Sequence, residues 1–134
     1  MISKGEAGRI EKERTDLLIA ERRLSLLLDL DQTLIHATVD PMVGEWLNNP
    51  SNENYPKLTE VHQFQLPESP LVYYIKLRAY TREFLERMNK IFEMHIYTMG
   101  TRTYAHAVAK ILDPSKKYFK DRILSRDDSG SNLF

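Results

Sequence analysis

Two aspartates, Asp29 and Asp31, are separated by one leucine and directly follow an apolar run at positions 24–28. In an extended chain, residues two positions apart point to the same side. Two carboxylates on one side repel each other, and a hard cation such as Mg²⁺ relieves this repulsion because it prefers oxygen ligands. The pair therefore predicts a magnesium site. The structural alternative is that both aspartates cap a turn that Thr33 completes.

Phosphoryl transfer through an aspartyl-phosphate uses such a pair. One carboxylate attacks phosphorus, and it needs no activating base because it is already ionised at neutral pH. The other carboxylate protonates the leaving oxygen and later activates the water that releases phosphate. Mg²⁺ neutralises charge on the phosphoryl oxygens. This chemistry requires no thiol, in agreement with a chain that contains no cysteine.

A second group of polar residues lies in the segment IYTMGTRTYA at positions 96–105. Thr98 ends an alternating segment, Gly100 permits a tight turn, and a helix is expected to start near Thr101. Free N–H groups at such a junction attract anions, so Thr98 and Arg102 are candidates for binding a phosphoryl group. The alternative is that Thr101 simply caps the helix and Arg102 faces solvent.

The elements that must position these residues alternate between strand and helix patterns. This order predicts an α/β fold with a parallel sheet. Residues 1–23 are expected to form an N-terminal helix with a weak apolar stripe, and residues 38–70 an irregular insertion with one short helix near 43–47. The remaining predicted elements are strands at 24–29, 71–77, 92–97 and near 122–124, and helices at 81–90 and 104–112.

Composition excludes some classes of function. The chain has 134 residues, of which 42% are hydrophobic, and 19 basic residues balance 19 acidic ones. Without net charge, direct nucleic-acid binding is not expected, and no apolar run is long enough to suggest a membrane partner. Residues 71–134 carry 12 basic and 7 acidic residues, which makes this half the better place for an anion site.

These motifs together resemble the FCP-homology family of haloacid dehalogenase-like phosphatases. DLDQT matches the D-x-D-x-T motif of that family, and YTMGTRTYA matches its second motif. The longer segments LSLLLDLDQTLIHATVDPMVGEW and YFKDRILSRDDSGS resemble the branch that acts on the RNA polymerase II C-terminal domain. The resemblance covers about residues 5–131 and implies a Rossmannoid parallel sheet with an insertion after the first strand.

The resemblance also implies roles for individual residues. Asp29 would be the nucleophile and a Mg²⁺ ligand. Asp31 would be the general acid and base, with its backbone carbonyl on the metal, and Thr33 would support the loop. The residues expected to contact the phosphoryl group or the substrate are Thr98, Arg126, Arg102 and Arg78. For Arg78 and Arg102, surface salt bridges are the alternative. The implied substrate is a phosphoserine peptide of the polymerase heptad repeats, the implied partner TFIIF and the implied location the nucleus.

The chain departs from the family pattern after SRDDSGS. Family members continue into a catalytic lysine and an acidic pair on a further strand, so residues 24–134 are interpreted as the N-terminal part of the phosphatase domain, incomplete at the C-terminus. Weak Mg²⁺ binding and little turnover are therefore expected, with the strand at 24–29 on an exposed sheet edge. Two other functions remain open: a binding module for the phosphorylated repeats that lacks catalysis, and a small-molecule phosphatase.

Overall fold

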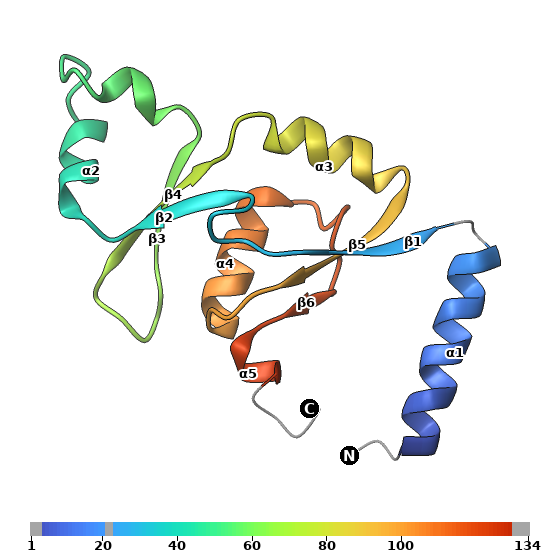
Figure 1. The fold of residues 1–134 in the computed structure, drawn as a ribbon. Helices are drawn as coiled ribbons and strands as arrows, with labels where there is room; N and C mark the ends of the chain where they lie inside the picture. Colours follow the sequence, from blue (N-terminus) through green and yellow to red (C-terminus); the bar gives the residue numbers. More distant parts are fainter. Residues whose placement is uncertain (1–3, 21–22, 130–134) are drawn as a thin grey trace.

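The computed structural model describes residues 4–20 and 23–129. Three parallel strands form sheet A in the order β1 (Leu24–Leu28), β5 (Phe92–Tyr97) and β6 (Ile123–Leu124). Helix α3 (Thr81–Asn89) precedes β5, and α4 (Arg102–Leu112) connects β5 to β6 (Figure 1). The strands and helices predicted for these segments are confirmed. A last short helix, α5 (Arg126–Ser129), was not predicted.

The insertion is more ordered than its sequence suggests. Antiparallel sheet B consists of β2 (Ile35–Thr38), β4 (Val72–Leu77) and β3 (Val61–Gln65), in that order. Helix α2 (Pro41–Leu47) and the 3₁₀ helix η1 (Tyr55–Leu58) connect β2 to β3. Two predictions were therefore wrong. Residues 61–65 form a strand, and the strand at 71–77 pairs with its antiparallel neighbours rather than with the parallel sheet.

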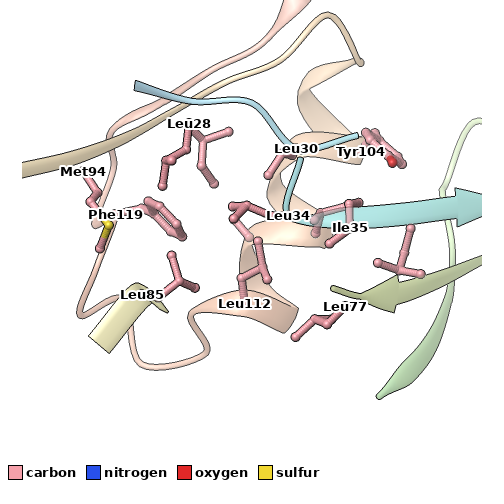
Figure 2. Packing of buried hydrophobic residues seen from close by; sticks show 14 of the residues in the cluster. Leu28, Leu30, Leu34, Ile35, Leu77, Leu85, Met94, Tyr104, Leu112 and Phe119 are labelled. Atoms are coloured by element: carbon pink, nitrogen blue, oxygen red, sulfur yellow. The ribbon is translucent and has the colours of Figure 1, made fainter. Parts of the chain in front are cut away.

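One hydrophobic core joins the two sheets with helices α3 and α4 (Figure 2). Leu28, Met94 and Ile96 from sheet A are at most 7% exposed. They pack with Leu112 of α4 and with Phe119 from the segment before β6. Leu30, Leu34, Ile35 and Leu77 extend the same cluster to the start of sheet B. The loop after β1 therefore runs directly over the core, and burial of its leucines fixes its position.

Strand β1 lies at the edge of sheet A. Its continuous apolar run favoured a fully buried strand, but Leu24 and Leu27 are 68% and 63% exposed. The burial prediction was therefore wrong for Leu24 and Leu27, whereas the expected edge position is confirmed within the described residues.

Helix α1 (Lys4–Ala20) lies beside β1 (Figure 1). In the weak apolar stripe that was predicted for this helix, Ile10 and Leu17 do not pack into the core, because they are 46% and 56% exposed. Instead, Arg14 of α1 forms an ion pair with Glu93 and a 2.8 Å hydrogen bond with His95, both on β5. The two ends of the predicted helix, residues 1–3 and 21–22, lie outside the described residues. Within the described part of the chain, none of the helices is long and apolar enough to cross a membrane.

The register of sheet A brings three loops together at the carboxyl ends of its strands. Leu28 pairs with Ile96, and Tyr97 pairs with Leu124. The N–H of Thr98 donates to the carbonyl of Leu124 over 2.9 Å. The chain therefore leaves β1, β5 and β6 at nearly the same level. In open α/β sheets this edge is where ligands bind.

Candidate active site

The loop after β1 presents the two aspartates and buries the residue between them. Leu30 is fully buried, and Asp29 and Asp31 on either side of it are exposed. The Leu30 carbonyl accepts hydrogen bonds from the N–H groups of Thr33, Leu34 and Ile35, at 3.0–3.1 Å. The Leu30 N–H donates to Oδ1 of Asp29 over 2.8 Å. Burial of a single leucine therefore places both carboxylates on the solvent side of a tightly bonded loop.

Gln32 completes this loop in a left-handed conformation, with φ of 63°. Its N–H donates to the carbonyl of Ile35 over 2.7 Å. Thr33, predicted to support the loop, contributes through its backbone: its N–H binds Leu30, and its carbonyl accepts a 3.2 Å bond from Nη1 of Arg78. The backbone N–H of Arg78 also donates to the Leu34 carbonyl over 2.9 Å. Arg78 thus holds the loop from the side of sheet B, and its predicted contact with substrate stays a prediction.

Tyr104 was not predicted as a site residue, yet its hydroxyl donates a 2.6 Å hydrogen bond to Oδ1 of Asp31. The residue begins the helix predicted at 104–112, and no motif in the sequence indicates a role for its hydroxyl. Burial and the carboxylate of Asp31 together raise the pKa of Tyr104 far above its ordinary value, so the phenol stays protonated and acts as the donor. A buried tyrosine needs a partner for its hydroxyl, and this need was the available signal.

The segment from Thr98 to Thr101 forms the second side of the candidate site, next to the aspartate loop. Thr98 is 2% exposed, and its hydroxyl accepts a 3.1 Å bond from the N–H of Gly100. That bond uses the hydroxyl as an acceptor, so its hydrogen is compatible with donation to a phosphoryl oxygen. Thr101 is the N-cap of α4 and accepts from the N–H of Tyr104 over 3.3 Å. The predicted helix start and its cap are confirmed.

Arg102 is exposed and forms a surface salt bridge with Asp128, which was the alternative stated for it. Its guanidinium donates to Oδ1 of Asp128 over 2.9 Å, and its backbone N–H donates to Oδ2 of Asp127 over 2.7 Å. The anion at the N-terminus of α4 is therefore a carboxylate from α5. Binding of a phosphoryl group by Arg102 stays a prediction, and it would compete with Asp128.

Arg126 begins α5, and its backbone N–H donates to the carbonyl of Gly100 over 2.9 Å. This bond places the exposed Arg126 next to the Thr98–Thr101 segment, whereas Arg78 lies on the other side of the aspartate loop. The register of sheet A thus places Asp29, Asp31 and Thr98 in neighbouring loops at one edge. Arg126 is bonded to the second of these loops and Arg78 to the first.

The hydrogen bonds to Asp128 lead to a prediction about pH. The backbone N–H and the hydroxyl of Ser125 donate to Oδ2 of Asp128 over 2.9 and 2.8 Å. These two bonds, followed in size by the bond from Arg102, lower the pKa of Asp128 to about 2. A pKa lowered by folding favours the ionised form in the folded state. The stabilisation from Asp128 is therefore complete above its unfolded pKa of 3.8 and is lost as pH falls through about 2. Carboxyl ¹³C titration by NMR should show this midpoint, and a midpoint near 3.8 would contradict the described hydrogen bonds.

The aspartate loop also fits a magnesium ion. Mg²⁺ is commonly held by one or two carboxylates, with waters and substrate phosphate oxygens completing its octahedron. Asp29 and Asp31 offer two exposed carboxylates within one three-residue loop. Within residues 4–20 and 23–129, no group of three or more metal-binding side chains is found. The loop, with the Asp29 carboxylate and the Asp31 backbone carbonyl, thus fits an ion that takes few protein ligands and keeps several waters.

The parallel sheet, with an aspartate loop after its first strand and an inserted antiparallel sheet, has the haloacid dehalogenase-like α/β fold. The solved structure of Fcp1, an essential RNA polymerase II CTD phosphatase, is similar to this chain, with a TM-score of 0.87 and 55% identity. The match covers 91% of this chain and 35% of that one. A fission yeast Fcp1 variant bound to beryllium fluoride matches with the same TM-score of 0.87. The chain belongs to the NLI interacting factor-like phosphatase family, which it matches over residues 24–132. The resemblance seen in the sequence is confirmed.

Named relatives point to one branch of this family. The chain is 54% identical to the RNA polymerase II C-terminal domain phosphatase of Schizosaccharomyces pombe, over 97% of this chain and 18% of that protein. It is 38% identical to the human RNA polymerase II C-terminal domain phosphatase, over 96% of this chain and 12% of that protein. The chain therefore spans less than a fifth of the length of either relative.

Proposed function

We propose that this chain carries the nucleophile and the general acid of a Mg²⁺-dependent protein serine phosphatase that acts on the heptad repeats of the RNA polymerase II C-terminal domain. The observation that carries the proposal is the loop Asp29–Leu30–Asp31, whose buried leucine holds two exposed carboxylates at the carboxyl edge of the parallel sheet, where Thr98 follows the neighbouring strand. The names of the relatives support the substrate. We extend the proposal to the nucleus as location and to TFIIF as a partner of the whole protein.

In the first step, a carboxylate oxygen of Asp29 attacks phosphorus, and the bond from phosphorus to the serine oxygen breaks. Asp31 gives a proton to that departing oxygen. In the second step, a water oxygen attacks the aspartyl-phosphate, and the bond between phosphorus and Asp29 breaks. Asp31 takes the proton that the water loses, so inorganic phosphate leaves and both aspartates return to their starting state. Thr98 donates its hydroxyl to a phosphoryl oxygen.

The Asp29 carboxylate and the backbone carbonyl of Asp31 would hold Mg²⁺, which when bound neutralises charge on the phosphoryl oxygens. With one carboxylate and one backbone carbonyl as its protein ligands, the chain is expected to bind the ion weakly and to turn over slowly.

The test uses the 134-residue chain with Mg²⁺ and a phosphoserine heptad peptide. We expect slow, Mg²⁺-dependent release of phosphate and a phosphoryl group on Asp29, which borohydride reduction followed by mass spectrometry will locate. Peptide binding without phosphoryl transfer would favour the binding module instead. Equal hydrolysis of small phosphate esters and of the peptide would favour the small-molecule phosphatase.

A further inference from the structure

The ring of Tyr104 is fixed from three directions. The tyrosine is 8% exposed, and its ring centroid lies 6.1 Å from that of Phe64 and 5.7 Å from that of Tyr73. Phe64 and Tyr73 stack on each other at 5.4 Å with an interplanar angle of 8°. On the third side is Gly100, where an added Cβ would come within 2.6 Å of Cδ1 of Tyr104. The ring therefore has little freedom to turn or to withdraw.

The fixed ring of Tyr104 directs its hydroxyl toward one oxygen of the Asp31 carboxylate. The hydroxyl lies 2.6 Å from Oδ1 of Asp31, a short distance for an O–H···O bond. Asp31 itself is exposed on a loop, so its carboxylate would otherwise sample several rotamers. Among the described residues, Tyr104 is the hydrogen-bond partner that the structure gives to the Asp31 carboxylate. The orientation of that carboxylate therefore depends on the tyrosine.

We infer that Tyr104 is a positioning residue for Asp31: its hydroxyl holds Oδ1, so that Oδ2 is the oxygen that exchanges the proton. This inference rests on the proposed function, in which Asp31 is the general acid and base. The proton leaves Oδ2 for the serine oxygen as that oxygen separates from phosphorus, and it returns to Oδ2 from water as the aspartyl-phosphate is cleaved. Tyr104 touches Asp31 and not the phosphoryl group.

The inference also gives sheet B a role in catalysis. Phe64 lies on β3 and Tyr73 on β4, both in sheet B, whereas Asp31 and Tyr104 belong to the parallel-sheet part of the fold. The stacked rings of Phe64 and Tyr73 pack against the Tyr104 ring, whose hydroxyl orients the Asp31 carboxylate. The geometry of the proton transfer is therefore set by packing between the two sheets as well as by the aspartate loop.

The first test compares Tyr104→Phe with the unmodified chain on two substrates in single-turnover experiments. A serine leaving group needs a proton from Asp31, whereas p-nitrophenolate departs without one. We expect release of the dephosphorylated peptide to slow about tenfold or more, the burst of p-nitrophenol to change less than twofold, and KM for the peptide to stay within about twofold. A merely structural role would slow both substrates equally, and such a result would overturn the inference.

Gly100→Ala provides an independent perturbation, because its methyl group would push the ring of Tyr104 away from Asp31. Slower release of the peptide is expected again, and the double variant should be no slower than the slower single variant, since both changes remove one interaction. Selectivity between the two substrates is read from Tyr104→Phe alone, because the Gly100 N–H also binds the Thr98 hydroxyl. Additive losses would argue against the shared mechanism. Tyr55→Phe is the matched control, because Tyr55 is 40% exposed in the 3₁₀ helix η1 and should behave like the unmodified chain.

A readout that does not depend on turnover separates the two proposals. In crystals of Tyr104→Phe, the Asp31 side chain is expected to adopt a different rotamer or several rotamers. An unchanged Asp31 carboxylate would overturn the positioning role even if the chain proved inactive. Absence of phosphoryl transfer in the unmodified chain would instead reject the proposed function.

Discussion

Replacing Asp29 by asparagine is expected to abolish aspartyl-phosphate formation and to lower peptide hydrolysis about a thousandfold or more. The amide of asparagine is a poor nucleophile toward phosphorus and carries no charge for a cation. The change is nearly isosteric, and the amide oxygen can still accept the 2.8 Å bond that the Leu30 N–H donates to Oδ1 of Asp29. The loop should therefore keep its shape, so the loss would report on chemistry rather than on folding.

The measurement is phosphate release from the phosphoserine peptide, together with mass spectrometry for a phosphorylated residue. Asp16→Asn is the matched control, because Asp16 lies exposed on α1 and should leave both readouts unchanged. Asp31→Asn should differ from Asp29→Asn, since it retains the nucleophile and still permits phosphorylation by an aryl phosphate. If Asp29→Asn kept more than about a tenth of the activity, the nucleophile would have to be another residue.

The elements that carry the site were predictable because their local signals agree with their final environment. In strand β5, apolar and polar residues alternate as expected for a core strand. In helix α4, apolar residues recur at helical spacing, Thr101 is the N-cap, and Pro114 follows soon after the end. Strand β3 was missed for the opposite reason. Its sequence VHQFQ is short and polar and lies among prolines, and it becomes a strand through pairing with β4, where Phe64 faces Tyr73. Such pairing is a tertiary property.

The site was predictable where it depends on short-range spacing. Asp29 and Asp31 follow from alternation around Leu30, which the structure buries completely. The bond from Tyr104 to Asp31 joins residues 73 positions apart, and the one from Arg102 to Asp128 joins residues 26 positions apart. These contacts form only when α4 packs against the sheet, so no local sequence motif predicts them. Arg102 shows the consequence: its position at a helix start indicates an anion partner, but not which anion.

The second large effect concerns stability, at the turn that connects α4 to β6. Asp113 is 5% exposed, and its carboxylate accepts three backbone hydrogen bonds. Oδ1 accepts from the N–H of Lys117 over 2.7 Å, and Oδ2 accepts from those of Tyr118 and Phe119 over 3.0 Å each. Phe119 is 1% exposed in the core, so this turn anchors a large apolar side chain. Asp113→Ala is expected to lower the free energy of unfolding by about 3–5 kcal/mol, because it leaves buried donors without an acceptor.

Urea denaturation of Asp113→Ala, Asp113→Asn and the control Asp121→Ala measures this effect. Asparagine keeps one acceptor oxygen but turns an amide toward a backbone donor, so its loss should lie between the other two. Asp121 is exposed, and its replacement should change the free energy of unfolding by less than about 0.5 kcal/mol. A loss below about 1 kcal/mol for Asp113→Ala would show that the turn holds without its carboxylate.

The turn leads into β6, whose Leu124 carbonyl binds the Thr98 N–H. A weakened turn should therefore also loosen the segment from Thr98 to Thr101, and faster amide exchange at Thr98 would reveal this link.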